Sequence, residues 1–475
     1  YKINQLTPIS CLFVSFFCNK SESREVCCRC IPSFGFSCFL TSRCISLSSP
    51  NFFTMKVLIQ QVRVIDPLSP LHGTTQDIFI DAGVIAAIDT HLSVSADQVI
   101  NGQELHVSPG WVDIFAHFAD PGYEYKETLE TGAAAAAAGG YTDVLVIPNT
   151  RPVIDSKSQA EYIRHKSASL PVNIHPIGAV SKGTEGKDLA EMYDMRISGS
   201  PAFSDGLNPL QSAGILLKAL QYVKAFDGVI IQIPDDKSVG SNGLMHEGII
   251  STRLGLPGKP MMAEELMVAR DIKLARYTGS RLHFTGVTSP RSFEYIKRAK
   301  EGGLYVTCSV TPYHLFFTDE DLMDYDTNLK VYPPLRSAAE RDVIRQCVAD
   351  GTVDCIASHH LPHEYDSKVV EFENARFGMT GLETTYAALK TALPDVPEEK
   401  WVNLLCHNPR KIFGLEQPSL SKGAPACITL FEPKGQTKVD VAFFRSRSKN
   451  SAFIGKQLNG RVKGIINGEQ VILNY

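Results

Sequence analysis

A regular alternation of short apolar segments and longer helical segments, from residue 112 to residue 358, limits the fold of this 475-residue chain most strongly. The helical segments include Gln211–Phe226, Glu264–Tyr277, Ser289–Lys300 and Ala338–Asp350. Glycines follow several of them, as expected at helix C-termini. The segments with strand character are Val112–Phe118, Tyr141–Pro148, Val172–Val180, Gly199–Ser204, Gly228–Pro234, Arg281–Val287, Leu304–Val310 and Val353–Ser358. The alternation predicts an α/β protein with a (β/α)₈ TIM barrel.

A doubly wound open sheet is the structural alternative for such an alternation. It would require a glycine-rich phosphate loop after the first strand, and the sequence contains none there. The run Ala133–Ala138, followed by Gly139 and Gly140, instead fits a helix that packs closely against a barrel wall.

Both ends of the chain beyond the barrel show the alternation of β-strands. Val57–Val64 and Gly83–Ile88 alternate on the N-terminal side, and short apolar runs such as Val439–Phe444 recur on the C-terminal side. We therefore expect one small β-subdomain built from both ends. The predicted division is 55–108 for its N-terminal part, 109–415 for the barrel and 416–475 for its C-terminal part.

Residues 1–54 differ in composition from the remainder. They contain no methionine and hold seven of the twelve cysteines. We expect a non-native or disordered leader, with the native start at Met55, in preference to a targeting peptide, because a basic segment and a cleavage site are missing. The five later cysteines show no paired spacing, which suits reduced thiols and a cytoplasmic location.

The net charge of −4 and the absence of a basic stripe interleaved with aromatic residues argue against nucleic-acid binding. No apolar run after Met55 is long enough for a membrane span.

In a barrel of this type the functional site lies at the C-terminal ends of the strands. The residues at those ends are 113–122, 148–152, 203–206, 232–236, 282–289, 311–315 with 328–336, and 358–363. Among them and just beyond stand several specific motifs: Asp120-Pro121-Gly122 followed by Glu124 and Lys126-Glu127, the Asn149 turn, Pro333-Pro334-Leu335-Arg336, and Phe377-Gly378 leading to Gly381-Leu382-Glu383-Thr384.

With these motifs the chain resembles the dihydroorotase family, the cyclic amidohydrolases of pyrimidine synthesis, from Met55 to the C-terminus. Allantoinases and hydantoinases share the fold and much of the pattern. The resemblance implies a zinc centre that activates water to open a cyclic amide. Its ligands would be two histidines on strand one, a carboxylate on strand four and one histidine each on strands five and six, with an aspartate on strand eight as ligand and proton shuttle.

This sequence departs from that pattern at most of the implied positions. Phe115, Ile233 and Gly286 stand where three histidines are implied, and His359 stands at the position of the shuttle aspartate. The implied substrate-binding arginine and asparagine are replaced by Ala119 and Tyr332. The metal-ligand candidates that remain are His117 and Asp205, and the substrate-binding candidates are Asn149 and His363.

Phenylalanine, isoleucine and glycine side chains offer no lone pair to a metal, so we expect tight zinc binding at this site to be lost. His117 then fits a hydrogen-bonded structural residue, and Asp205 fits either a ligand or the end of a strand in a turn. The catalytic residues remain unknown. His359, His360 and His363 form the one concentration of histidines that could support different chemistry.

We therefore expect a dihydroorotase homologue that has lost catalysis and has a scaffolding or partner-binding role without a cofactor. The resemblance makes a homo-oligomer, or a complex with aspartate transcarbamoylase or another pyrimidine-pathway enzyme, the expected assembly. The alternative is an active zinc-dependent cyclic amidohydrolase with a rearranged site around His117, Asp205, His359 and His360.

Overall fold

A computed structural model describes residues 55–474, and the expectations for residues 1–54 lie outside them. The predicted strands of the barrel are present, somewhat shorter than expected. They are β6 (Trp111–Ala116), β7 (Tyr141–Val146), β8 (Asn173–Pro176), β9 (Ala202–Phe203), β10 (Val229–Gln232), β13 (Arg281–Phe284), β14 (Val306–Val310) and β15 (Cys355–Ile356). All the pairings among these strands are parallel.

Two isolated bridges close these strands into a ring. The strands form one sheet in the order β6-β7-β8 and another in the order β15-β14-β13-β10-β9. A parallel bridge between Gly178 and Phe203 joins β8 to β9, and one between Ala116 and His360 joins β6 to the segment after β15. The backbone N–H of His117 also donates to the carbonyl of His360 at 2.8 Å. The eight-stranded barrel is therefore confirmed.

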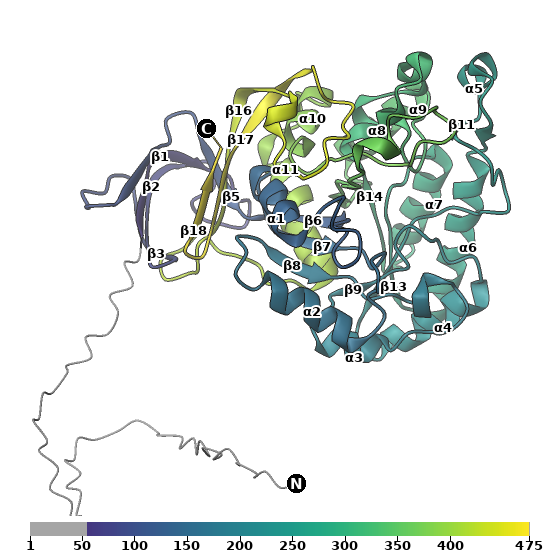
Figure 1. Cartoon of the computed structure of the whole chain (residues 1–475). Helices are drawn as coiled ribbons and strands as arrows, with labels where there is room; N and C mark the ends of the chain where they lie inside the picture. Colours follow the sequence, from purple (N-terminus) through teal and green to yellow (C-terminus); the bar gives the residue numbers. More distant parts are fainter. Residues whose placement is uncertain (1–54, 475) are drawn as a thin grey trace, which may run out of the picture. The chain divides into compact units, whose positions relative to one another are not determined.

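Helices surround the barrel (Figure 1). They are α1 (Leu129–Ala138), α2 (Lys157–Ser167), α3 (Met192–Ile197), α4 (Ala213–Lys224), α6 (Met262–Thr278), α7 (Pro290–Glu301), α8 (Pro312–Phe316), α9 (Ala338–Asp350), α10 (Thr385–Ala392), α11 (Glu398–Val402) and α12 (Asn408–Phe413). Their ends follow from local sequence. Ser337 and Glu340 form a capping box at the start of α9, and Gly351 ends this helix in the left-handed conformation.

A long loop connects β10 to α6 at the barrel mouth. It contains β11 (Met245–His246), α5 (Ile249–Leu254) and β12 (Gly258–Lys259). Side chains from alternate strands fill the barrel interior, where Ile147, Ile231 and Ile233 belong to one buried apolar cluster that extends to Phe413. Apolar side chains thus fill much of the barrel interior, as expected for a barrel of eight strands.

The β-subdomain is one sheet in the order β18-β17-β16-β5-β1-β2-β3, with β4 paired to β1. Its strands are β1 (Lys56–Val64), β2 (Thr75–Asp81), β3 (Val84–Asp89), β4 (Gln98–Asn101), β5 (His106–Pro109), β16 (Cys427–Lys438), β17 (Gln457–Asn467) and β18 (Gln470–Leu473). β5 and β16 pair antiparallel, with Ile428 opposite Pro109. The expectation that both ends of the chain build one subdomain is confirmed.

The strand expected at Val439–Phe444 is wrong. These residues contain a 3₁₀ turn, η6 (Val441–Phe443), because the Asp440 carboxylate accepts a hydrogen bond from the backbone N–H of Phe443 at 3.0 Å. Asp440 thus caps a turn where a strand would need extended backbone.

The Ala-rich helix α1 is almost entirely buried. Its small side chains allow close packing, and the adjacent Gly140 has a φ of +90° with no room for a Cβ, which would lie 2.9 Å from Thr429 Cγ2.

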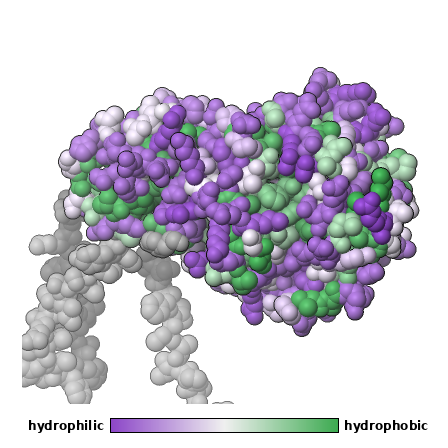
Figure 2. Space-filling view, turned by 90° about the horizontal axis from the view of Figure 1, so that it is seen from above, coloured by the Kyte–Doolittle hydropathy of each residue, from purple (hydrophilic) through white to green (hydrophobic). Residues whose placement is uncertain are grey.

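Polar side chains predominate on the face shown in Figure 2, and apolar ones form small separate groups. No helix within residues 55–474 is both long and apolar enough to cross a membrane.

Candidate functional site at the barrel mouth

The residues at the implied ligand positions meet at the barrel mouth, where they are buried. Phe115 and Ile233 are 2% and 1% exposed, and both belong to the apolar cluster of the barrel interior. The remaining cavity measures about 20 Å³, room for about one water molecule. Its lining residues are Phe115, His117, Ile147, Leu207, Tyr313, Tyr332, His359, His360, Leu361 and Gly378.

The His359 ring occupies the space beside Gly286. It packs against Phe115 with the ring centroids 4.8 Å apart. A Cβ on Gly286 would lie only 2.8 Å from Cε1 of His359 and 3.1 Å from Cδ of Pro333. A side chain at position 286 and the imidazole of His359 therefore exclude one another in this arrangement.

His359 is also the end, on the side of the barrel mouth, of a buried chain of hydrogen bonds that runs through the barrel interior. Its Nε2 lies 2.8 Å from the Thr285 hydroxyl, which accepts a hydrogen bond from the Ser309 hydroxyl at 2.9 Å. The chain continues from Ser309 to Nε2 of His283 at 3.1 Å, and from Nδ1 of His283 to the Thr307 hydroxyl at 2.8 Å.

The polarity of this chain fixes the tautomers of its histidines. Because Ser309 donates to Thr285, the Thr285 hydroxyl proton is free to donate to Nε2 of His359. His359 therefore carries its proton on Nδ1. By the same reasoning, Nε2 of His283 donates to Ser309. Burial lowers the pKa of both histidines to about 3, so both are neutral at neutral pH.

His117 makes a structural contact with the turn after β7. Its Nε2 lies 3.1 Å from the carbonyl oxygen of Asn149, so that nitrogen carries the proton and donates. Burial lowers the pKa of His117 to about 4. Its Nδ1 has no hydrogen-bond partner among residues 55–474. The structure thus favours the structural interpretation of His117, with one lone pair left free.

Asp205 forms hydrogen bonds with the loop that follows β8. Its Oδ1 accepts hydrogen bonds from the backbone N–H groups of Val180 at 2.9 Å and Ser181 at 2.8 Å, and its Oδ2 accepts from the Ser181 hydroxyl. Burial raises the pKa of Asp205 to about 6. Of the two interpretations of Asp205, ligand or turn residue, this geometry favours the turn residue.

Asn149 holds the same region together, since its amide donates to the Asp205 carbonyl at 3.1 Å and accepts from the Leu207 N–H at 3.0 Å. His363 lies in a different environment, with its Nε2 2.9 Å from the Phe377 carbonyl. The side-chain groups of these two substrate-binding candidates are thus engaged with the protein backbone.

His360 faces away from His359, toward helix α1. Its Nδ1 accepts from the Gly381 N–H at 3.2 Å, and its Nε2 lies 3.4 Å from the Glu127 carboxylate. The structure does not bring His359, His360 and His363 together as one donor set. Over the described part of the chain, no three His, Cys, Asp or Glu side chains are arranged to hold a metal ion.

Tyr332 lines the barrel mouth and contacts the loop between β10 and α6. Its hydroxyl donates to the Asp235 carboxylate, and the Lys259 ammonium lies 2.8 Å from the same carboxylate. The Lys259 ammonium also lies 5.4 Å from the centre of the Tyr332 ring. An aromatic side chain therefore occupies the position where the resemblance implies a substrate-binding asparagine.

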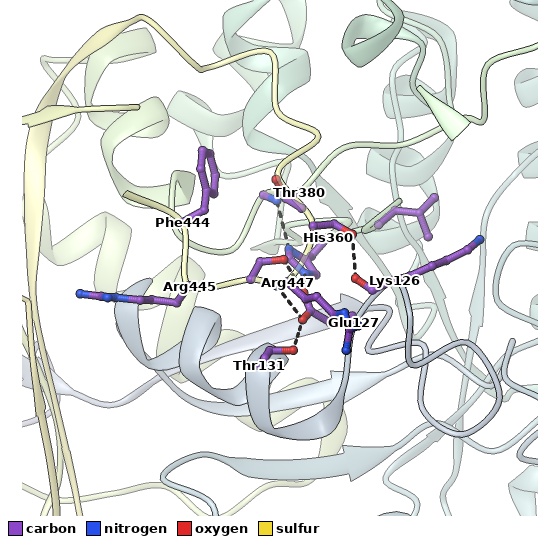
Figure 3. A network of polar contacts seen from close by, with 12 residues as sticks. Lys126, Glu127, Thr131, His360, Thr380, Phe444, Arg445 and Arg447 are labelled. Carbon is purple, nitrogen blue, oxygen red and sulfur yellow. Dashed lines mark hydrogen bonds and ion pairs between the residues drawn. The ribbon is translucent and has the colours of Figure 1, made fainter. Parts of the chain in front are cut away.

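A second polar cluster, which we call the carboxylate clasp, was not foreseen from the sequence. It consists of Glu127, Glu383 and His360 together with residues 445–447. Figure 3 labels Glu127, His360, Arg445 and Arg447 of this cluster. Glu127 accepts hydrogen bonds from the Arg447 N–H at 2.9 Å and from the hydroxyls of Thr131 and Ser446. These contacts attach the segment after η6 to the barrel mouth.

Glu383 contributes the other half of the clasp. Its Oε1 accepts from the backbone N–H groups of Arg445 and Ser446, each at 3.0 Å. Burial raises the pKa of Glu383. Burial also acts to raise the pKa of Glu127, but the nearby His360 imidazole and the hydrogen bonds from Ser446 and Thr131 outweigh it and lower that pKa. Both glutamates stand in motifs that carry the family resemblance, so the sequence did mark these two positions as candidates for a functional role. Their partners in 445–447 had no signal in the sequence.

Comparison with known proteins agrees with the fold and the motifs. Residues 105–292 match the family model described as "Dihydro-orotase-like". A protein of Pelotomaculum thermopropionicum named "Dihydroorotase" is 41% identical over 423 residues, which cover 88% of this chain and 99% of that protein. A protein of Thermoanaerobacter sp., also named "Dihydroorotase", is 40% identical over 420 residues, which cover 87% of this chain and 97% of that protein.

The chain belongs to the dihydroorotase family. Its barrel also resembles that of the L-hydantoinase (dihydropyrimidinase) of Arthrobacter aurescens, with a TM-score of 0.78 and 24% identity over 88% of this chain and 96% of that one. At this identity the structural similarity supports the amidohydrolase barrel fold alone. The chain is thus a dihydroorotase-like amidohydrolase whose mouth differs from the implied zinc centre.

Proposed function

We propose that this dihydroorotase homologue does not open cyclic amides and has a non-catalytic, partner-binding role. The observation that supports the proposal best is the packing at the mouth. Three implied ligand positions hold Phe115, Ile233 and Gly286, and the space beside Gly286 is filled by the His359 ring. The cavity that remains, about 20 Å³, is far smaller than ordinary small-molecule sites of about 300 to 1,000 Å³.

The donors present do not fit a catalytic zinc ion, which is held by three protein ligands with a fourth position for water. His117 offers one free nitrogen, while the Asp205 carboxylate accepts three hydrogen bonds from Val180 and Ser181. The Nε2 lone pair of His359 already accepts a hydrogen bond from the Thr285 hydroxyl, so it is not free for a metal. Assembly of a zinc site would break these hydrogen bonds.

The alternative is an active cyclic amidohydrolase with a rearranged metal site. It is favoured by the similarity of about 40% to proteins named "Dihydroorotase", extending over nearly their whole length. It would require His117, Asp205, His359 and His360 to leave their present partners and turn toward one centre.

We expect the purified chain to hold less than one equivalent of zinc and to show no detectable hydrolysis of dihydroorotate. The reason is that the imidazole donors at three ligand positions are gone. Metal analysis and a dihydroorotate assay check this, with the Pelotomaculum relative purified in parallel as the control. One or two tightly bound zinc ions, with turnover that a chelator abolishes, would establish the alternative.

The partner proposal is a complex with aspartate transcarbamoylase, with another pyrimidine-pathway enzyme, or with further copies of this chain. We expect one of these chains to co-purify when the protein is isolated under native conditions from its source. Recovery of a monomer without partners, together with unchanged pyrimidine synthesis after substitution of exposed residues, would remove the scaffold role but leave the prediction on zinc standing.

A further inference from the structure

Residues 433–463, which we call the basic segment, carry strong positive charge in a chain whose net charge is −4. They contain eight lysines and arginines and a single acid, Asp440. Within residues 55–474, the one ion pair of this segment joins Arg461 to Glu432, with 3.3 Å between nitrogen and oxygen. Exposed cations of the segment therefore remain without an acidic partner, and these are Lys434, Lys438, Arg445 and Arg447.

The rim of the barrel mouth carries the opposite charge. Residues 319–326 and 364–376, which follow β14 and β15, together contain nine acids against two cations, Lys368 and Arg376. Lys368 is buried, and its ammonium donates to the backbone carbonyl of Arg376 at 2.7 Å. The two stretches lie together, because the Thr327 hydroxyl donates to the carbonyl of Lys368. We call them the acidic rim, and none of its acids takes part in an ion pair with any other residue of the described chain.

The basic segment and the acidic rim are neighbours above one part of the core. Leu322 and Phe372 of the rim belong to the same buried apolar cluster as Val439 of the basic segment. The ring of Phe317, just before the rim, lies 4.9 Å from the ring of Phe453 in the basic segment. In Figure 1 this is the part of the molecule where β17, α10 and α8 pack together. Two surfaces of opposite charge thus adjoin without neutralising each other.

Both surfaces also expose apolar side chains. In the basic segment, Val441 is 57% and Ile454 is 37% exposed, and on the acidic rim Tyr365 is 76% and Val369 is 58% exposed. Protein interfaces combine such apolar contacts with a surrounding of polar and charged groups. The two surfaces therefore offer a second protein chain apolar contact as well as charge.

We propose, on the basis of the partner-binding role proposed above, that two copies of this chain associate through these surfaces. The basic segment of each copy lies on the acidic rim of the other. A two-fold symmetric pair requires a surface that is complementary to itself, and adjoining basic and acidic surfaces meet this requirement, because the symmetry brings each onto its opposite. An unrelated acidic partner would leave the acidic rim unpaired, and the rim would repel nucleic acid.

Sedimentation velocity of the full chain at low and high salt tests this pairing. We expect a dimer whose dissociation constant rises with salt, because salt screens charges at the edge of an interface. The double reversal Lys438→Glu with Arg445→Glu should raise the dissociation constant at least about a hundredfold, because like charges then face each other. Glu320→Lys with Asp324→Lys should have the same effect. All four side chains are exposed, so both variants should fold, which circular dichroism and the unfolding midpoint would verify.

A mixture of the two charge-reversed variants gives the sharpest outcome. One variant then presents two acidic surfaces and the other two basic ones, so together they should form a heterodimer within about tenfold of the original affinity. Lys297→Glu with Arg298→Glu, exposed on α7 outside both surfaces, is the matched control and should dimerise as the unchanged chain does.

An unchanged chain that sediments as a monomer at about 100 μM would overturn the proposal, since its association would then be weaker than that of a stable dimer. Dimers unaffected by either reversal, or reversed variants that do not associate when mixed, would overturn it as well. Zinc content and dihydroorotate turnover, measured separately, decide whether the chain is catalytic, so a monomer would leave that prediction standing.

Discussion

Glu127→Ala should lower the free energy of unfolding by about 3–5 kcal/mol, because it removes a buried charged acceptor that several groups of the clasp share. The Glu127 carboxylate accepts hydrogen bonds from the Arg447 N–H and the Ser446 and Thr131 hydroxyls and lies 3.4 Å from Nε2 of His360. Without it, the buried Ser446 hydroxyl and the part-buried Arg447 N–H and Thr131 hydroxyl lose this acceptor. Urea denaturation followed by circular dichroism gives the measurement.

Glu130→Ala provides the matched control for this loss. Glu130 lies three residues further on, in the first turn of α1, and is exposed. Removing an exposed acid from the first turn of a helix should cost only about 0.3–1 kcal/mol. If Glu127→Ala cost no more than Glu130→Ala, the carboxylate clasp would not hold residues 445–447 to the barrel.

The barrel could be predicted from the sequence because its signal is local. Each strand and helix is marked by its own apolar pattern and by its end residues, such as the capping box of Ser337 and Glu340. A β-subdomain shared by both ends of the chain could also be expected, because both ends show strand patterns, whereas the pairing of β5 with β16 that joins them is known from the structure alone. The wrong strand at Val439–Phe444 shows the limit of this reasoning, since a short apolar run also fits a capped turn.

The candidate site was harder to predict, because its meaning depends on contacts between distant residues. The sequence indicated that Phe115, Ile233 and Gly286 stand at the implied ligand positions. It could not indicate that Thr285 and Ser309 link His359 to His283 through the barrel. Nor could it show which partners Asp205 has, because Val180 and Ser181 come from another strand end.

The replacements at positions 286 and 359 should be energetically coupled. Gly286 has a φ of +70°, so any side chain there is strained, and its Cβ would lie 2.8 Å from Cε1 of His359. We expect Gly286→His to lower the free energy of unfolding by about 2–5 kcal/mol, the sum of backbone strain and overpacking. Adding one implied ligand back would thus destabilise the chain and displace His359.

Gly303→His separates the two contributions to this loss. Gly303 has a φ of +75° but no heavy atom within 4 Å of its ideal Cβ, so its substitution reports backbone strain alone, about 1–2 kcal/mol. The further loss in Gly286→His measures the conflict with its packed neighbours, chiefly His359.

Removing the imidazole should relieve that conflict. His359→Ala in the Gly286→His background should cost about 1–3 kcal/mol less than His359→Ala alone, which a double-mutant cycle of urea denaturation measures. Equal losses in Gly286→His and Gly303→His, or a coupling near zero, would mean that His359 does not fill the space at position 286. The coupling we expect would mean instead that a histidine at position 286, the implied ligand position on the sixth barrel strand, fits only when residue 359 is changed as well. Gly286 and His359 would then depend on each other for their packing.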